Sequence, residues 1–124
     1  MGLFSATDID AQQASREFQH VLLAGENVLA AFRTIRDTML LTDMRIVYVN
    51  VQGITGSKVE YQSIPWRSVI RFSIETAGTF DLDADMKVWV SGAAVPIEAK
   101  ISRKSNPNAI QQIMSEHVLG RANK

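Results

Sequence analysis

The sequence predicts a mainly β domain with flanking helices, and three observations lead to this fold class. Through the middle of the chain, apolar and polar residues alternate with a period of two, as in strands that bury one face. Gly53, Gly56 and Pro65 separate these strand-like runs. The C-terminal segment instead has the spacing of an amphipathic helix. Consecutive short strands indicate a small barrel or sandwich, and the final helix would close one open end of it.

The amino-acid composition excludes several kinds of functional site and partner. The chain has 124 residues, which is the length of one domain. It has no cysteine, which excludes disulfides, thiol catalysis and thiolate metal sites. The 13 basic and 13 acidic residues cancel, so the clustered positive charge that nucleic acids require is missing and no net charge opposes self-association. We expect no nucleic-acid partner and no cofactor.

The N-terminus has neither the basic region nor the apolar run of a targeting segment. Met1 and Gly2 match the start of a myristoylation signal, but Ala6 stands where that signal needs Ser or Thr. No stretch approaches the roughly 18 apolar residues of a membrane span. We therefore expect a cytoplasmic protein and no membrane partner.

A helix is predicted over Thr7–Leu23, where Thr7 can cap the first turn and Gly25 ends the segment. A second helix is predicted over Asn108–Leu119, after the Asn-Pro pair that favours a helix start. Residues 1–24 would form an N-terminal helical extension, residues 25–120 the domain, and residues 121–124 a frayed tail. Six strands are expected between the helices, at 28–35, 39–51, 57–64, 68–75, 80–91 and 95–102.

Three segments resemble the bacterial pleckstrin-homology-like (PH-like) domain family. Leu41–Val49 resembles the family's strand L-T-x-x-R followed by apolar residues, and Ile64–Val69 resembles its I-P-[YW]-x-x-I strand entry. Glu75–Val90 is similar to the signature of a single-domain branch of the group. The resemblance runs from about Gly25 to Leu119, and the order and spacing of the three segments make it specific.

The resemblance implies a partly open barrel of two near-orthogonal antiparallel sheets, capped by the C-terminal helix. It also implies a cyclic homo-oligomeric ring, with five subunits as the expected number, that binds another protein through a polar strand surface. It implies no enzymatic activity. The family fold has seven strands, so the run Thr79–Val90 would break near Asp83–Asp85 to supply the seventh.

Asp81, Asp83 and Asp85 are the sharpest candidates for chemistry. The pattern D-x-D-x-D opens a calcium loop, but methionine and glycine occupy the positions where that loop requires glycine and glutamate. No metal is therefore expected. In a strand the three carboxylates share one face, which is either an ordinary solvated face or an acidic partner-binding strip. Their mutual repulsion favours a cationic neighbour such as Lys87.

A second candidate set is Thr42, Arg45, Glu75 and Thr76. Arg45 lies in a strand that is otherwise apolar, where an unpaired charge is costly, so we expect an ion pair. Glu75 or one of the aspartates is the expected partner. The set either fixes the sheet register or forms part of the polar partner surface.

Arg33 and Arg36 flank the turn between the first two predicted strands. They support the alternative function, a peripheral membrane or phosphoinositide-like lipid-binding module, since clustered cations clamp phosphates. An ordinary surface loop is the competing interpretation, because Asp37 lies beside them and the loop has no lysine.

Trp89 falls on the polar face by strict alternation. A large apolar ring there indicates either a contact, with the N-terminal helix or across a subunit boundary, or a bulge that turns the ring inward. The two histidines lie outside any catalytic or metal motif, and no nucleophile motif occurs. The sequence thus predicts a non-enzymatic, self-assembling module that mediates protein–protein interactions.

Overall fold

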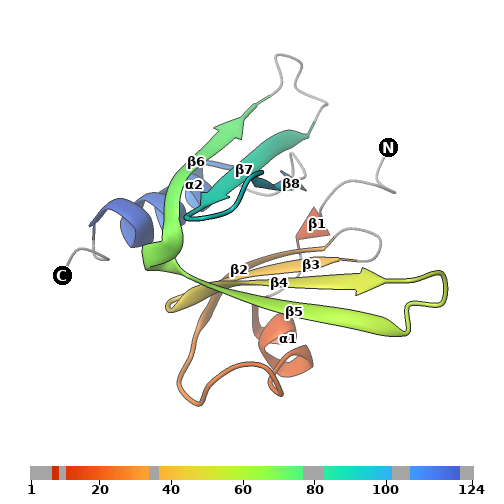
Figure 1. The fold of residues 1–124 in the computed structure, drawn as a ribbon. Helices are drawn as coiled ribbons and strands as arrows, with labels where there is room; N and C mark the ends of the chain where they lie inside the picture. Colours follow the sequence, from red (N-terminus) through yellow and green to blue (C-terminus); the bar gives the residue numbers. More distant parts are fainter. Residues whose placement is uncertain (1–6, 9–10, 34–36, 77–82, 102–106, 121–124) are drawn as a thin grey trace.

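The structure is a computed structural model that describes residues 7–8, 11–33, 37–76, 83–101 and 107–120. It contains a five-stranded antiparallel sheet in the order β1-β2-β3-β4-β5 and a three-stranded antiparallel sheet in the order β6-β7-β8 (Figure 1). The strands are β1 (Thr7–Asp8), β2 (Val28–Arg33), β3 (Thr38–Thr42), β4 (Arg45–Gln52), β5 (Lys58–Pro65), β6 (Val69–Glu75), β7 (Ala84–Val90) and β8 (Ile97–Ile101). The helical elements are α1 (Ala11–Glu17), the 3₁₀ turn η1 (Trp66–Ser68), α2 (Pro107–Ser115) and the π-helical turn η2 (Glu116–Gly120).

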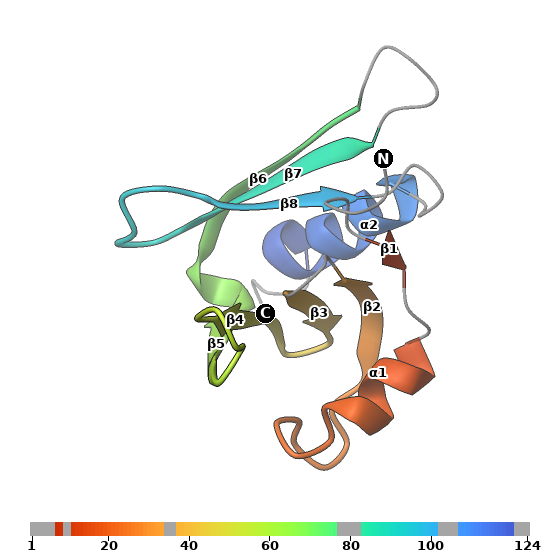
Figure 2. The ribbon, with the colours of Figure 1, turned by 90° about the vertical axis from the view of Figure 1, so that its right-hand side faces the viewer.

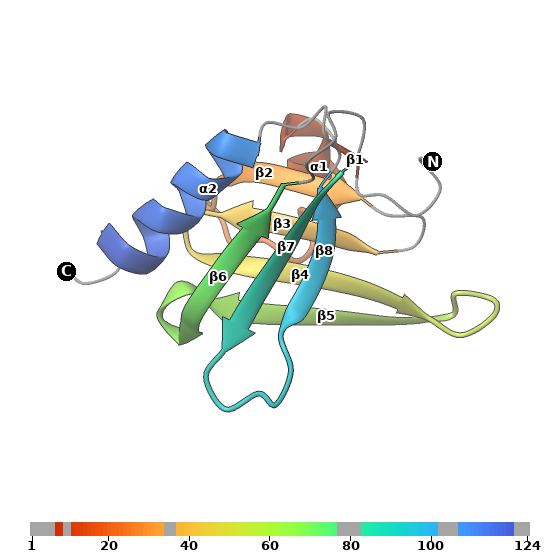
Figure 3. The same cartoon turned by 90° about the horizontal axis from the view of Figure 1, so that it is seen from above.

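The two sheets form two layers whose strands cross steeply when viewed from above (Figure 3). The chain passes from one layer to the other through η1, which directly follows β5. Trp66 is buried at this corner, and its indole Nε1 donates a hydrogen bond of 3.0 Å to the carbonyl oxygen of Thr42. The corner is thereby tied to the turn between β3 and β4.

The main core lies between the two sheets and is closed at one end by α2 (Figure 2). Ile110 and Met114, four residues apart on α2, both belong to this core. The strands contribute their alternate apolar residues, such as Met86 and Val88 of β7, which are almost fully buried. The predicted amphipathic pattern and the capping role of the C-terminal helix are therefore confirmed.

A second, smaller core lies on the other side of the five-stranded sheet, where α1 packs. Ala14 and Phe18 bury their side chains against this side of the sheet, together with Leu40 and Val47. Because β3 is covered from both sides, all five of its residues are buried. The predicted fold class, mainly β with two antiparallel sheets and helices at both ends, is confirmed.

The predicted N-terminal helix was too long. Thr7 and Asp8 form β1, which pairs with Arg33 and Phe32 at the edge of the sheet. The α-helix ends at Glu17, and turns follow it. The residues that were expected to start the helix pair with β2 instead. The local sequence does not reveal this pairing, because the partners are about 25 residues apart.

The strand predicted over 39–51 is two strands, β3 and β4, joined at Asp43 and Met44. The hydroxyl of Thr42 accepts hydrogen bonds from the backbone N–H groups of Met44 and Arg45, both at 3.0 Å, and so holds the turn. β7 begins at Ala84 and runs unbroken to Val90, and the residues before Asp83 that would form the separate seventh strand lie outside the described residues. The other five predicted strands are present, although their ends at 34–35, 80–82 and 102 lie outside the described residues.

Candidate interaction surface

The outward side of the three-stranded sheet forms a polar face. Along β7, Ala84, Met86 and Val88 point into the core, so the residues between them point outward. Pairing between the strands aligns the outward residues in three rows across the sheet. The polar face consists of Glu75, Asp85 and Lys100 in the first row, Ser73, Lys87 and Glu98 in the second, and Arg71 and Trp89 in the third.

Charges of opposite sign neighbour each other across this polar face. Lys100 Nζ lies 2.7 Å from Asp85 Oδ1 in an exposed ion pair. The hydrogen bond to Asp85 raises the pKa of Lys100, so the lysine stays protonated. Lys87 lies directly opposite Glu98 on β8. The cationic neighbour of Asp85 is therefore Lys100 and not Lys87, which was predicted and which lies in register with Glu98 instead.

Arg71 lies over the ring of Trp89 at the other end of the polar face. The guanidinium carbon is 4.1 Å from the ring centroid, in the geometry of a cation–π contact. The irregularity in this ladder lies in β6 between Val69 and Arg71, and it leaves Ile70 exposed. Since β7 itself alternates without interruption, the inward-turning bulge proposed for Trp89 is wrong.

Arg45 belongs to a buried polar network rather than to the polar face. Its Nε and Nη2 donate to the two carboxylate oxygens of Glu26, each at 2.8 Å, in a bidentate pair. Nη2 also donates to the carbonyl oxygen of Val21, and Nη1 donates to Ser63 Oγ. The hydroxyl of Thr42 donates to Glu26 at 2.7 Å. Glu26, Thr42 and Arg45 are called the brace below.

The brace corrects two predictions. The ion-pair partner of Arg45 is Glu26, not Glu75 or an aspartate. Thr42 is fully buried, so its side chain is not available to a partner surface. The hydrogen bonds from Arg45 lower the pKa of Glu26 from 4.5 to about 2 despite its burial, so the carboxylate stays charged. Sequence reasoning missed Glu26, whose one signal is that it is a lone acid two residues before the first long strand.

The remaining predicted residues are dispersed. Glu75 ends β6, Thr76 follows it, and both are exposed. Asp83 is half-buried and directly precedes β7. Asp81 and Arg36 lie outside the described residues. Arg33, the described member of the lipid-binding pair, forms an ion pair with Glu17 of α1.

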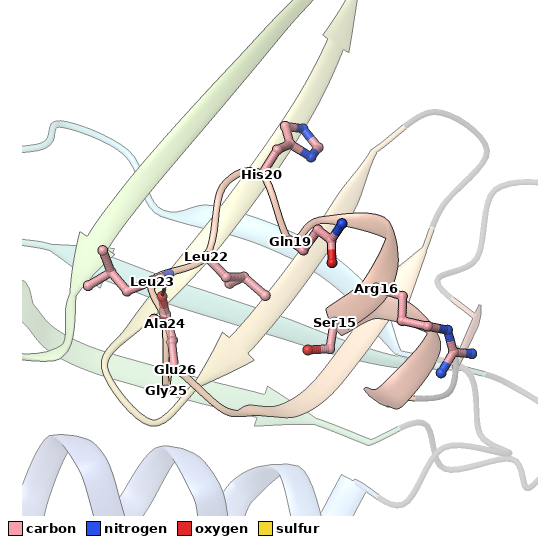
Figure 4. A pocket seen from close by; sticks show the side chains of 9 residues that line it. All are labelled: Ser15, Arg16, Gln19, His20, Leu22, Leu23, Ala24, Gly25 and Glu26. Carbon is pink, nitrogen blue, oxygen red and sulfur yellow. Dashed lines mark hydrogen bonds between the residues drawn. The ribbon is translucent and has the colours of Figure 1, made fainter.

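An open hollow of about 680 Å³ lies beside the C-terminal half of α1 and the loop after it (Figure 4). Figure 4 shows Arg16 at one end of the hollow and Leu23 at the other. Glu26, which also lines the hollow, is fully engaged by the brace. Within the described ranges, no group of three metal-binding side chains occurs and no helix is long and apolar enough to cross a membrane.

Comparison with known proteins gives consistent matches along the chain. The family model of the bacterial PH domain matches residues 1–118. Among curated proteins, the chain is 48% identical over 102 residues to the uncharacterized protein YjqA of Bacillus subtilis (strain 168), and the match covers 82% of each chain.

Solved structures agree with this assignment. A protein with a pleckstrin-homology domain from Shewanella loihica PV-4 superimposes with a TM-score of 0.81 at 32% identity, covering 94% of this chain and 99% of that one. A pleckstrin homology domain from Shewanella amazonensis SB2B gives a TM-score of 0.69 at 35% identity and covers 93% of each chain. The two-layer fold, the terminal helices and these matches show that the chain belongs to the bacterial PH domain family.

Proposed function

We propose that this PH-like domain is a non-enzymatic assembly module of the cytoplasm. It forms a cyclic homo-oligomeric ring, with five subunits as the expected number, and binds a protein partner through the polar face. The observation that carries the proposal is the position of Trp89, a large ring that lies under Arg71 on the outward, polar face of the three-stranded sheet.

Trp89 and Arg71 have the character of a contact centre. Tryptophan and arginine are the residue types most enriched where protein interfaces gain most of their binding energy. Ile70 lies beside Arg71 and is 66% exposed, which adds apolar area next to the pair. This end of the polar face therefore suits a neighbouring subunit, and a neutral chain offers no long-range repulsion against it.

The opposite end of the polar face suits a different partner. Glu75 and Asp83 lie near the Asp85–Lys100 pair, so acidic groups outnumber basic ones there. Such a patch attracts a basic protein segment, and charge complementarity would set the rate and selectivity of binding more than its strength. Asp81 would extend the patch, as the sequence predicts.

The lipid-binding alternative has less support. Arg33 is engaged by Glu17, which neutralises the cation that would hold a lipid phosphate. Asp37, next to the same turn, accepts hydrogen bonds from Tyr48 and from the backbone of Val51. The described residues of this turn thus combine a paired arginine with an engaged aspartate, which weakens the case for an anion site.

Sedimentation velocity of two alanine variants tests the proposal. Trp89→Ala should shift the protein from a multi-subunit species to a slower-sedimenting one. Leu119→Ala is the matched control, because Leu119 is 63% exposed and lies on η2 rather than on the polar face. If Trp89→Ala sedimented like the wild type, Trp89 would not be part of the subunit contact.

A further inference from the structure

The backbone of β5 has a free side, and one hydrogen bond shows which residues face it. The N–H of Val51 donates to Asp37 Oδ1 at 3.0 Å, and Asp37 directly precedes β3. The backbone of Val51 therefore points toward β3 and away from β5, because β4 lies between those two strands. Val51 pairs with Val59, so the N–H and C=O of Val59 point away from β4, outward at the edge of the sheet.

Alternation extends this result along the strand. Tyr61 and Ser63 also direct their backbone groups outward, since they follow Val59 at intervals of two in an unbroken ladder. β5 is the last strand of its sheet, and no backbone partner for these three residues is found in the described part of the chain. Val59 and Tyr61 are also 41% and 45% exposed. The edge thus combines free hydrogen-bonding groups with exposed apolar side chains.

The sheet edges at β8 and β1 are protected. The N–H of Ser91 donates to the carbonyl oxygen of Ser68, which orients the odd-numbered residues of β7 toward β6. The even-numbered residues then bond to β8 and leave Glu98 and Lys100 with outward backbone groups. Charged residues at such positions discourage pairing with another strand. β1 is only two residues long, whereas β5 has eight.

We propose that a second copy of this chain docks along β5, strand against strand, about a two-fold axis. The charges on β5 select the register. With Val59 opposite Val59 of the second copy, Lys58 faces Glu60 of the second copy, and symmetry repeats the pair. Lys58 and Glu60 are both exposed and lie on the same side of the strand, so both pairs can form.

The neighbouring registers are worse. A shift that places Val59 opposite Tyr61 of the second copy sets Glu60 against Glu60, and like charges directly opposite are destabilising. A shift that places the two Tyr61 residues opposite each other leaves Lys58 and Glu60 facing uncharged residues. Only one register pairs opposite charges, which favours a second copy over an unrelated strand as the occupant.

A charge-exchange experiment tests the contact on the full chain. Lys58→Glu and Glu60→Lys each place two like-charge pairs across the axis, and the double variant restores two opposite-charge pairs. By sedimentation equilibrium, each single variant should raise the dissociation constant of the pair about tenfold or more, and the double variant should recover most of the loss. A double variant as weak as the single variants would overturn the proposal.

Proline substitution tests the backbone component. Val59→Pro removes an outward N–H and no bond to β4, and proline is tolerated on edge strands at such positions. Glu98→Pro is the matched control, because Glu98 has an outward N–H on β8. Val59→Pro should abolish the two-fold contact and Glu98→Pro should leave it intact. Equal effects of the two variants would contradict the proposal, and the charge-exchange series tests it even if a proline variant fails to fold.

The contact does not depend on the proposed ring, and the two proposals fail differently. If the ring is absent, the wild type should sediment as two subunits and Val59→Pro as one. If the ring forms without this contact, Val59→Pro should keep the mass of the wild type. If both contacts exist, the wild type should be a pair of rings, and Val59→Pro should have half the wild-type mass.

Discussion

Arg45 and Glu26 form a bidentate ion pair, with both donor–acceptor distances at 2.8 Å, in which the carboxylate is completely buried. The pair joins the loop after α1 to the start of β4. Thr42 adds a third hydrogen bond to the same carboxylate, and the N–H of Leu23 adds a fourth. The pair satisfies the buried charge and positions the segment that leads into β2.

Arg45→Met should destabilise the fold by about 3–5 kcal/mol, because it leaves the Glu26 carboxylate buried without its counter-ion. Urea denaturation followed by circular dichroism measures this change. Arg67→Met is the control, since Arg67 is exposed on η1 and should alter stability by less than about 0.5 kcal/mol. A small effect at Arg45 would mean that water replaces the guanidinium at the brace.

The free energy of unfolding should fall in acid, over a pH range set by the pKa of Glu26. The pKa of this carboxyl is about 2 in the folded chain and 4.5 without the fold, so the unfolded chain binds the extra proton first. The contribution of about 3 kcal/mol is complete above pH 4.5 and is lost as pH falls through 2. Denaturation of the wild type and Glu26→Gln across this window measures it, and a Glu26→Gln variant with the wild-type pH dependence would contradict the assignment.

Tyr48 should show the opposite dependence at alkaline pH. Burial and the neighbouring Asp37 raise the pKa of Tyr48 from 10.0 to about 12. The folded chain therefore keeps a proton that the unfolded chain has lost, and stability falls as pH rises from 10 through 12. Absorbance titration of the phenolate should show a late-ionising tyrosine that Tyr48→Phe removes. If Tyr48→Phe kept the late-ionising tyrosine signal, the tyrosine with the raised pKa would not be Tyr48.

Met114→Ala should cost about 2–5 kcal/mol, because Met114 is completely buried and α2 closes the main core through it. Thermal unfolding measures the loss. Gln112→Ala, an exposed position on the same helix, should leave the melting temperature nearly unchanged. Similar effects of both substitutions would mean that α2 is held by its helical propensity rather than by packing.

Periodicity was enough to predict most of the fold. The alternation along β6, β7 and β8 and the apolar stripe of α2 are local patterns, and the structure agrees with both. The turn at Asp43 and Met44 was missed because neither residue is a glycine or proline. A buried threonine hydroxyl holds this turn, and the sequence around it is otherwise apolar enough to resemble one long strand.

The candidate site was predictable only in part. The outward position of Trp89 follows from alternation alone, whereas Arg71 over its ring depends on pairing between strands. Glu26 and Arg45 are separated by 19 residues and meet only because the β2–β3 hairpin brings them together. The free edge of β5 depends on strand order, which no residue pattern reveals.

The mass of the wild-type chain in solution tests the central claim most directly. Light scattering on a size-exclusion column should give one discrete species of five subunits, or of ten if rings pair through β5. Trp89→Ala should dissociate the ring into smaller species. A wild-type protein that remains monomeric at micromolar concentration would contradict assembly and would leave the polar face as the binding site of a monomeric module.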